Sequence, residues 1–287
     1  MVDGTLVGVP LYTLAAYEGM GVAPSALRGA GLLSALAAQV DLGDLPVPQL
    51  KKDILEGRTK NLNHFKSATT TVFAALKAAK ADRVFILGGE CSETVGAMAG
   101  LAEAFGGKAG MLWLDAHGDF NTPDTSPSGY IGGMCLAFAC GRSPELGLFS
   151  GASAPLADER LVHVGSRALD PPEVAAFTSS PAKLFTSQQV KRTGAAEVAE
   201  EAARHLENRS DWIACHLDVD VIDPAFMPAV NYPEPGGLTP DECSSMIKAV
   251  VATGKLRALE IAAYNPQKER TDSSASALID MLRRALG

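Results

Sequence analysis

The stretch Gly110-Met-Leu-Trp-Leu-Asp-Ala-His-Gly-Asp119 indicates the fold, together with Trp212-Ile-Ala-Cys-His-Leu-Asp-Val-Asp220. Each stretch begins with an apolar run, which predicts a buried strand, and ends in acidic side chains. Side chains on a strand alternate between its two faces with a period of two. We therefore expect Asp115, His117 and Asp119 to point to one side where the first strand ends. Asp218 and Asp220 should do the same at the end of the second.

Similar apolar runs alternate with Ala-rich helical stretches along the whole chain. This alternation predicts an α/β fold, in which a parallel sheet carries helices on both faces. Ligands bind beyond the carboxyl ends of the strands in such sheets, which is where both acidic strings lie. We see no linker and no repeat, so residues 1–287 are predicted to form a single domain. The expected strands are 6–10, 83–87, 111–115, 161–165, 213–221 and 257–263, and the main expected helices are 25–40, 61–81, 195–208 and 273–286, with a loop at 41–48.

Composition restricts the classes of function. The 287 residues are 47% hydrophobic, which is enough to bury a sizeable core. The net charge of −8 argues against a nucleic-acid or anionic-membrane surface and would suit a cationic substrate. The amino terminus shows no signal peptide, and no apolar run is long enough for a membrane helix. The 5 cysteines are odd in number and scattered, which favours a reduced, cytoplasmic protein over a disulfide framework.

The two acidic strings raise the question of what neutralises them. Buried carboxylates repel one another unless they are paired or bound to metal. Either string alone could equally be a polar strand end or a helix cap. Two strings at one edge of a sheet make a site for one or two divalent cations the better explanation, because carboxylate and imidazole are suitable ligands. His216 shares the strand parity of Asp218 but lies deeper, so we predict a core histidine whose hydrogen bonds are satisfied.

Three motifs resemble those of the ureohydrolase superfamily, which includes arginases, agmatinases and formimidoylglutamases. Gly88-Gly-Glu-Cys-Ser92 is similar to the family's Gly-Gly-Asp-His-Ser, and Asp115-Ala-His-Gly-Asp119 to its Asp-Ala-His-x-Asp. Asp218-Val-Asp-Val-Ile-Asp-Pro224 is similar to its Asp-x-Asp-x-x-Asp-Pro segment. The similarity runs from about residue 84 to Asn265-Pro266. It implies a three-layer α/β/α arginase-like fold with a central, mostly parallel sheet, and a homo-oligomer, either trimer or hexamer.

The resemblance also implies a centre of two Mn²⁺ ions bridged by a hydroxide, which attacks the guanidino or amidino carbon. Asp115 and Asp218 would then bridge the metals, His117 and Asp220 would complete one site, and Asp119 and Cys91 would complete the other. His117 and Asp119 would also be catalytic. The metal ligands implied by the resemblance are therefore Cys91, Asp115, His117, Asp119, Asp218 and Asp220.

At three positions the sequence departs from the arginase pattern. Cys91 stands where the family has a metal-binding His, and a thiolate is softer than imidazole and suits Mn²⁺ less well. A neutral thiol would leave that site short of a ligand, so we expect weak occupancy or another divalent metal there. Gly132 replaces a His that shuttles protons in arginases. Ala263 replaces a Glu that lies under the guanidinium, and Glu260, three residues earlier, is a poor substitute.

The positions that recognise an amino-acid end are retained. Asn121 and Ser128 match arginase residues that contact the α-carboxylate, and Asp170 matches one near the α-amino group. These residues favour an α-amino-acid substrate and argue against agmatine, which has no carboxylate. Cys91 and the segment Gly129-Tyr-Ile-Gly-Gly-Met134 most resemble the hydroxyarginine amidinohydrolase branch of the D-cycloserine pathway. That branch, however, keeps the Glu that Ala263 replaces.

The leading hypothesis is a metal-dependent amidinohydrolase. Its substrate would be a guanidino-type amino acid such as Nω-hydroxy-L-arginine or L-arginine, and its products ornithine plus hydroxyurea or urea. One alternative is a hydrolase of the formimidoylglutamase or agmatinase type. Another is a catalytically weak homologue that acts as a binding protein, which Cys91, Gly132 and Ala263 support. Retention of Asp119 and Asp220 argues against a pure binding protein.

Overall fold

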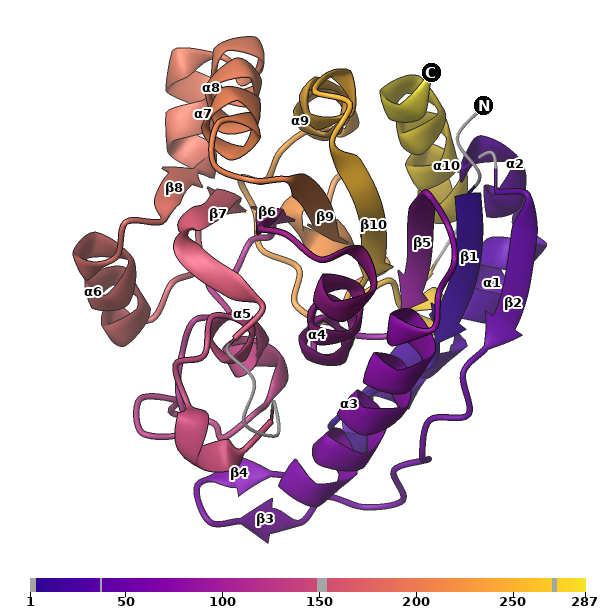
Figure 1. Cartoon of the computed structure of the whole chain (residues 1–287), viewed down its shortest axis with the longest axis vertical. Helices are drawn as coiled ribbons and strands as arrows, with labels where there is room; N and C mark the ends of the chain where they lie inside the picture. Colours follow the sequence, from indigo (N-terminus) through magenta and orange to yellow (C-terminus); the bar gives the residue numbers. More distant parts are fainter. Residues whose placement is uncertain (1–3, 37, 149–153, 270–272) are drawn as a thin grey trace.

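The computed structural model describes residues 4–36, 38–148, 154–269 and 273–287. Its centre is an eight-stranded sheet with the order β2-β1-β5-β10-β9-β6-β7-β8, in which every neighbouring pair is parallel (Figure 1). A small antiparallel hairpin, β3 and β4, lies apart from this sheet. The strands are β1 (Gly4–Val9), β2 (Val40–Asp44), β3 (Leu55–Glu56), β4 (Thr59–Lys60), β5 (Arg83–Gly88), β6 (Ala109–Leu114), β7 (Leu156–Ser166), β8 (Lys183–Thr186), β9 (Trp212–Asp218) and β10 (Leu256–Ala262).

Helices cover both faces of the sheet, and each face has its own apolar core (Figure 1). On β9, Cys215 and Leu217 face one core, while Ala214 faces the other, as strand alternation requires. The first face carries α1 (Ala23–Gly29), α2 (Leu32–Leu36), α7 (Ser187–Thr193), α8 (Ala195–Glu207), α9 (Pro240–Ala252) and α10 (Ser273–Leu286). The second carries α3 (Leu62–Lys77), α4 (Glu93–Phe105), α5 (Cys135–Ala139) and α6 (Pro171–Ser179). The predicted three-layer α/β/α fold with a parallel sheet is confirmed.

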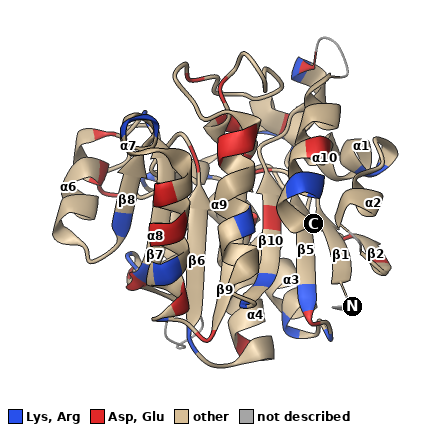
Figure 2. Ribbon diagram, turned by 90° about the horizontal axis from the view of Figure 1, so that it is seen from above, with Lys and Arg blue, Asp and Glu red and all other residues tan. Residues whose placement is uncertain are grey.

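Five short 3₁₀ segments join these elements within the described residues. They are η1 (Ala15–Val22), η2 (Gly132–Met134), η3 (Pro144–Leu146), η4 (Val219–Val221) and η5 (Pro266–Lys268). Figure 2 shows that charged residues lie mostly on helices and loops and that β10 carries an acidic position. From the sequence of β10, the acidic residue is Glu260. Among the described residues, no helix combines the length and the apolar character needed to cross a membrane.

The predicted helix over 25–40 is wrong in its extent. Gly31 adopts a φ of 91°, a left-handed conformation that glycine tolerates, and the helix divides there into α1 and α2. The predicted loop at 41–48 begins as the edge strand β2. Its polar sequence has little strand propensity, but pairing with β1 and ion pairs from Arg28 to Asp41 and Asp44 hold it in place.

Two further elements differ from the sequence predictions. β8 and α7 were not predicted at all, because Lys183–Thr186 is short and lacks an alternating apolar pattern. By contrast, α9 begins where the sequence Thr239-Pro-Asp-Glu242 favours a helix start. The Glu242 backbone N–H donates to Thr239 Oγ1 at 3.2 Å, and the Thr239 N–H donates to Glu242 Oε2 at 2.7 Å, which together form a capping box.

The strand order determines where a site can form. β9 and β10 come late in the sequence but insert between β5 and β6, so these four strands are neighbours at the centre of the sheet. All four run in the same direction, and their carboxyl ends therefore meet at one edge. The acidic strings follow β6 and β9, the Gly88-Gly-Glu-Cys turn follows β5, and Ala263 follows β10.

α3 and α4 pack closely because glycines face the contact. A methyl group added at Gly96 would lie 2.6 Å from the Thr69 carbonyl oxygen, and one added at Gly100 would lie 2.6 Å from the Phe73 carbonyl oxygen. Both distances are too short for a carbon–oxygen contact, and the obstacle is backbone in each case. The approach of the two helices therefore depends on these glycines.

We expect Gly100→Ala to lower the free energy of unfolding by up to about 2 kcal/mol, because overpacking costs about 1–3 kcal/mol and the helix-propensity gain of about 1 kcal/mol offsets only part of it. Gly29→Ala in α1 is the matched control, since nothing lies within 4 Å of the added methyl group. That control should be unchanged or slightly stabilised. Urea unfolding of both variants measures the difference. Equal stabilisation of both would contradict the packing argument.

Candidate metal centre

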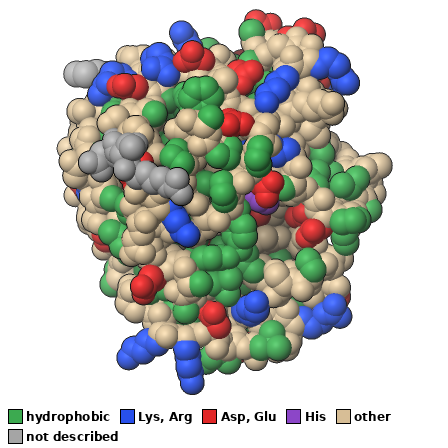
Figure 3. Space-filling view, turned by 180° about the vertical axis from the view of Figure 1, so that it is seen from behind, with side chains coloured by type: hydrophobic (Ala, Val, Ile, Leu, Met, Phe, Trp, Pro, Cys, Tyr) green, Lys and Arg blue, Asp and Glu red, His purple; other side chains and the backbone are tan. Residues whose placement is uncertain are grey.

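A cavity of about 460 Å³ lies at the carboxyl ends of the central strands. Figure 3 shows acidic side chains gathered around a histidine on this face of the molecule. Asp115 lies just below the cavity wall and is 1% exposed. The predicted site residues that line the cavity are Cys91, His117, Asp119, Asn121, Ser128, Asp170, Asp218 and Asp220.

The first acidic string leaves β6 as a turn and not as a continued strand. β6 ends at Leu114, and Asp115 accepts hydrogen bonds from Trp113 Nε1 at 2.9 Å and from the His117 backbone N–H at 2.7 Å. Asp119 adopts a φ of 50°, which no strand allows. The expectation that these residues share a strand face is therefore wrong beyond Asp115. The turn, held by the hydrogen bonds to Asp115, brings His117 and Asp119 to the cavity.

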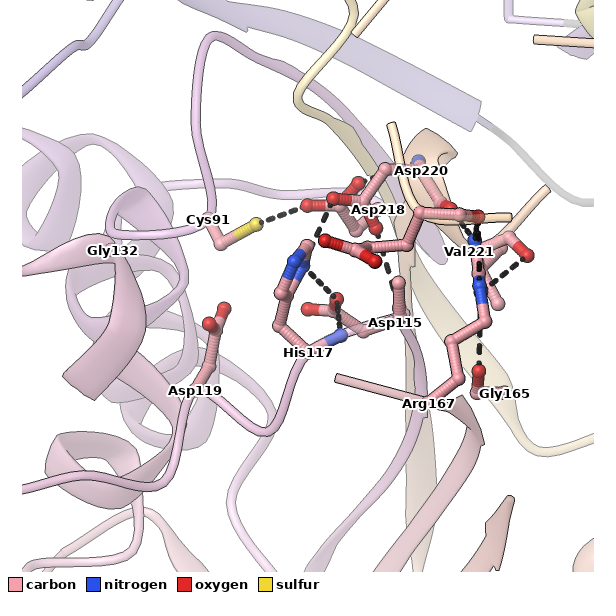
Figure 4. A network of polar contacts seen from close by, with 12 residues as sticks. Cys91, Asp115, His117, Asp119, Gly132, Gly165, Arg167, Asp218, Asp220 and Val221 are labelled. Carbon is pink, nitrogen blue, oxygen red and sulfur yellow. Dashed lines mark hydrogen bonds and ion pairs between the residues drawn. The ribbon is translucent and has the colours of Figure 1, made fainter. Parts of the chain in front are cut away.

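The second string also bends. β9 ends at Asp218, and Asp220 lies in η4, so the predicted strand over 213–221 is three residues too long. The Asp220 backbone N–H donates to Asp218 Oδ1 at 2.7 Å. Arg167, which no sequence motif singles out, donates to the carbonyl oxygens of Asp220 at 2.6 Å and Val221 at 3.1 Å (Figure 4). The guanidinium of Arg167 thus fixes the turn that presents Asp220.

The charges of the centre strongly perturb its ionisation. Burial raises the pKa of Asp119 and of Asp218 well above the usual range, and the nearby negative charges of Asp115 and Asp220 raise them further. Burial would lower the pKa of His117, but the charge of Asp220 and hydrogen bonds to Asp115 and Asp220 raise it to about 12. Its Nδ1 lies 3.1 Å from Asp220 Oδ2. An imidazolium at His117 therefore supplies positive charge that this acidic cluster requires.

Two groups of donor atoms could hold a metal ion in the part of the chain that the structure describes. Asp115, His117 and Asp220 offer atoms within 4.8 Å of one another, and so do Cys91, Asp115 and His216. The first group is the set of hard oxygen and imidazole donors that divalent cations accept. Asp119 belongs to neither group.

Cys91 lies beside the carboxylates, as the motif alignment predicts. Its Sγ donates to Asp218 Oδ2 at 2.9 Å, and the residue lines the cavity (Figure 4). Burial raises the pKa of the Cys91 thiol well above its usual range, and the charge of Asp218 adds to this effect. The thiol therefore keeps its proton until a cation compensates for the surrounding negative charge.

The predicted amino-acid-binding residues lie together on the cavity wall. Asn121 Nδ2 donates to Asp170 Oδ2 at 2.9 Å, and Thr125 Oγ1 donates to Asn121 Oδ1 at 2.9 Å. Glu173 accepts hydrogen bonds from the backbone N–H groups of Phe120 and Asp170, both at 2.9 Å, and so ties the two loops together. Ser128 lines the same cavity from an exposed position.

Tyrosine side chains form a part of the site that sequence reasoning missed. A methyl group added at Gly132 would lie 2.4 Å from Tyr130 Cζ, so Tyr130 occupies the space beside the glycine. The Tyr130 hydroxyl donates to Glu90 Oε2 at 3.0 Å. Tyr17 makes edge contacts with the rings of Tyr130 at 5.5 Å and Tyr232 at 5.6 Å. Tyr130 belongs to the sequence motif Gly129–Met134, but nothing in the sequence indicates that Tyr17 and Tyr232 contact it.

The two remaining sequence predictions concern Ala263 and His216. Ala263 lines the cavity with a φ of 65°, while Glu260 does not line it. This placement is consistent with the prediction that Glu260 is a poor substitute for the glutamate of arginases. His216 is buried as predicted, but only Nδ1 has hydrogen-bond partners, and Nε2 has none among the described residues. The prediction of a fully satisfied histidine is therefore wrong.

Comparison with known proteins identifies the class to which this fold and site belong. The Arginase family model matches residues 2–287. The arginase of Bacillus caldovelox is 32% identical over 99% of this chain and 97% of its own length, and human Arginase-1 is 30% identical over 96% and 88%. The solved structure of the Bacillus caldovelox arginase superimposes with a TM-score of 0.92 at 31% identity, covering 100% of this chain and 99% of that one.

The chain therefore belongs to the arginase family, and with it to the ureohydrolase superfamily. It is a hydrolase that acts on C–N bonds of linear amidines. The formimidoylglutamase of Bacillus subtilis shares the fold, with a TM-score of 0.80 at 21% identity over 99% of this chain and 86% of that one.

Metal binding should release protons, and affinity should rise with pH. In the absence of metal, the raised pKa values of Asp119, Asp218, Cys91 and His117 mean that these groups tend to hold protons. A group binds metal only after losing its proton, so a higher pH favours binding. Addition of Mn²⁺ to weakly buffered protein with a pH indicator measures the release, and equilibrium dialysis between about pH 6 and about pH 8 measures affinity. Binding that is independent of pH and releases no protons would contradict this electrostatic description.

Proposed function

We propose that the chain is a metal-dependent amidinohydrolase that cleaves a guanidino-type C–N bond of an α-amino acid, either Nω-hydroxy-L-arginine or L-arginine. The products would be ornithine plus hydroxyurea or urea. The observation that carries the proposal is a single cavity with the acidic cluster at its base and Asn121, Ser128 and Asp170 on its wall. Residues 1–287 would act as one catalytic domain.

The donor atoms at the base fit two divalent cations, with Mn²⁺ the expected ion. Asp115, His117 and Asp220 would hold one cation, since their donor atoms already lie within 4.8 Å of one another. Asp218 lies between Asp220 and Cys91 and would serve both cations. When bound, such cations lower the pKa of water and so provide a nucleophile at neutral pH. The carboxylates of the centre would also attract the cationic end of the substrate.

The wall residues would orient the amino-acid end of the substrate. The Asn121 side-chain amide is a hydrogen-bond donor suited to a carboxylate, and the Asp170 carboxylate is an acceptor suited to an ammonium group. The two are hydrogen-bonded to each other at 2.9 Å, so they are already positioned as a pair. A substrate with both groups would satisfy them at once, whereas agmatine would leave the carboxylate subsite empty.

The absence of a carboxylate at position 263 bears on which guanidino-type group of a substrate the site would accept. Ala263 lines the cavity where arginases have a glutamate, and the Glu260 carboxylate is engaged by His216 and Thr94. Glu90 lines the cavity but accepts hydrogen bonds from Thr13 and Tyr130. A hydroxyguanidine is less basic than a guanidine and has less need of a counter-charge. We therefore place Nω-hydroxy-L-arginine ahead of L-arginine.

Two alternatives remain within the proposal. Tyr130, which fills the space beside Gly132, favours a catalytically weak homologue that binds a ligand. A hydrolase of the formimidoylglutamase or agmatinase type is the other.

We further propose a cytoplasmic homo-oligomer, either trimer or hexamer, by analogy with the family. The 5 free cysteines and the net charge of −8 support a reducing compartment and a small-molecule partner, not nucleic acid or a membrane.

The test is product release from the Mn²⁺-loaded protein. We expect hydroxyurea from Nω-hydroxy-L-arginine, less urea from L-arginine, and none from agmatine. Asn121→Ala should raise KM about 10-fold or more, because a hydrogen bond to a charged group contributes about 1.5–3 kcal/mol. Asn63→Ala, on the exposed side of α3, is the control and should leave KM unchanged. No product from any substrate would favour the binding protein, and product from agmatine alone would favour an agmatinase type.

Restoring the family histidine should raise Mn²⁺ occupancy. Cys91→His replaces a thiol whose pKa is raised by burial with a neutral imidazole, which binds Mn²⁺ without first losing a proton at neutral pH. Elemental analysis after dialysis against Mn²⁺ measures the metal per chain. Cys140→Ser, which lies outside the cavity, is the control. An unchanged metal content in Cys91→His would show that the motif alignment misplaces this position.

A further inference from the structure

A row of three buried side chains lies one layer beneath the acidic cluster. Trp113 on β6 pairs in register with His216 on β9, and Glu260 on β10 pairs with His216 from the other side. Each residue of this inner row is at most 4% exposed. Asp115 and Asp218 follow Trp113 and His216 by two residues, which places the inner row directly below them on the same face.

Hydrogen bonds of Nδ1 select the tautomer of the His216 ring. Nδ1 lies 2.7 Å from Glu260 Oε2 and 3.1 Å from Thr94 Oγ1, and Thr94 also donates to Glu260. A carboxylate oxygen is an acceptor only, so the proton between His216 and Glu260 belongs to Nδ1. In a neutral ring Nε2 then carries a lone pair. Nε2 is fully buried and has no hydrogen-bond partner among the described residues.

One ring nitrogen of His216 lies among possible metal-binding atoms. A ring nitrogen of His216, the Cys91 sulfur and a carboxylate oxygen of Asp115 lie within 4.8 Å of one another. Because Nδ1 is engaged by Glu260, Nε2 is the nitrogen available to this group. The Trp113 ring stacks on His216 with centroids 3.7 Å apart and an interplanar angle of 11°, so the imidazole cannot turn freely.

This arrangement is that of a metal-binding histidine. Such histidines usually donate their second ring N–H to a carboxylate, which fixes the tautomer and the orientation of the ring. Glu260 and Nδ1 supply this feature here. Core histidines have no general need for a buried nitrogen without a protein partner, since buried polar atoms are nearly always hydrogen-bonded.

We propose that His216 Nε2 is a ligand of the second cation, which it binds together with Cys91 Sγ and Asp115; this rests on the proposed metal-dependent function. Asp218 Oδ2, 2.9 Å from Cys91 Sγ, completes a set of four donors. His216 thereby provides, from β9, the imidazole that the turn after β5 lacks because Cys91 stands there. Asp119 lies outside this set.

The proposed donors also define the metal. A thiolate, an imidazole and two carboxylates are the ligand types that Zn²⁺ binds, whereas Mn²⁺ prefers oxygen ligands. Asp115, His117 and Asp220 form a harder set. The two positions should therefore differ in preference, with Zn²⁺ or Co²⁺ at the His216 position and Mn²⁺ at the other.

The decisive variant is His216→Asn. The Asn side-chain amide can occupy the place of Nδ1 and keep a donor to Glu260, while nothing replaces Nε2. We expect bound Zn²⁺ to fall from two ions per chain to one and the affinity of the lost ion to fall at least about 100-fold, since even an outer-shell partner contributes about 10–100-fold. His205→Asn, a buried histidine on α8, is the matched control and should keep both ions. Equal stoichiometry and affinity in His216→Asn and in the unaltered protein would overturn the proposal.

Two further measurements separate a ligand from a structural role. In a Cys91→His background the restored imidazole should bind the second cation, so His216→Asn should then reduce affinity less than 10-fold. An equal reduction in both backgrounds would mean that His216 acts only on packing, and would overturn the proposal. In Co²⁺-loaded protein, the near-ultraviolet thiolate-to-cobalt band should be present and should weaken in His216→Asn. Unchanged intensity would also contradict the proposal.

The same experiment distinguishes this inference from the proposed function. If His216→Asn keeps both ions and the protein releases hydroxyurea, the ligand assignment fails and the function stands. If the protein binds two ions and His216→Asn loses one, but no substrate of the panel is cleaved, the ligand assignment stands and the function fails.

Discussion

Mutual repulsion among buried carboxylates is the constraint on which the rest of this structure depends. Four carboxylates lie at the ends of two adjacent strands and are each at most 7% exposed: Asp115, Asp119, Asp218 and Asp220. Water therefore cannot screen the repulsion among them well. The surrounding structure keeps them together nonetheless. Trp113 and backbone N–H groups hold Asp115 and Asp218, and Arg167 fixes the turn at Asp220. A fold that held this arrangement without cations would lose stability and gain nothing in return, and the proposed cation site is therefore the best explanation of the carboxylates.

The sheet gives this centre two layers with different chemistry. The upper layer faces the cavity and consists mainly of hard oxygen donors and His117. The lower layer, formed by Trp113, His216 and Glu260, is buried and would offer an imidazole nitrogen to the cluster. Cys91 contacts Asp218 of the upper layer and shares a group of donor atoms with His216 of the lower one. The proposed centre would be asymmetric. One cation would be held from above by residues of the family pattern, and the other partly from below.

The sequence predicted the architecture well, because alternating apolar strands and Ala-rich helices specify a doubly covered parallel sheet almost on their own. It also identified the residues that meet at the cavity, since motif spacing places them at strand ends. Strand alternation, however, explains only part of how these residues come together. Strand alternation fails after Asp115 and Asp218, because hydrogen bonds from backbone N–H groups to these carboxylates bend the chain. Tyr17, Tyr232 and Arg167 could not be foreseen, since they reach the site from segments far away in the sequence. The sequence around His216 predicts only a core histidine, and the register of β9 with β6 and β10 is needed to show which atoms surround its ring.

The packing of Tyr130 against Gly132 limits which single substitutions this site can accept. A histidine at position 132 would require the Tyr130 ring to move, because the ring fills the volume that the histidine Cβ would need. The ring is in turn fixed by its hydrogen bond to Glu90 and its contact with Tyr17. A histidine at position 132 would therefore need a smaller side chain at position 130 as well, and that second change would remove the hydrogen bond to Glu90. The two positions form one packing unit, so their side chains can be exchanged only together.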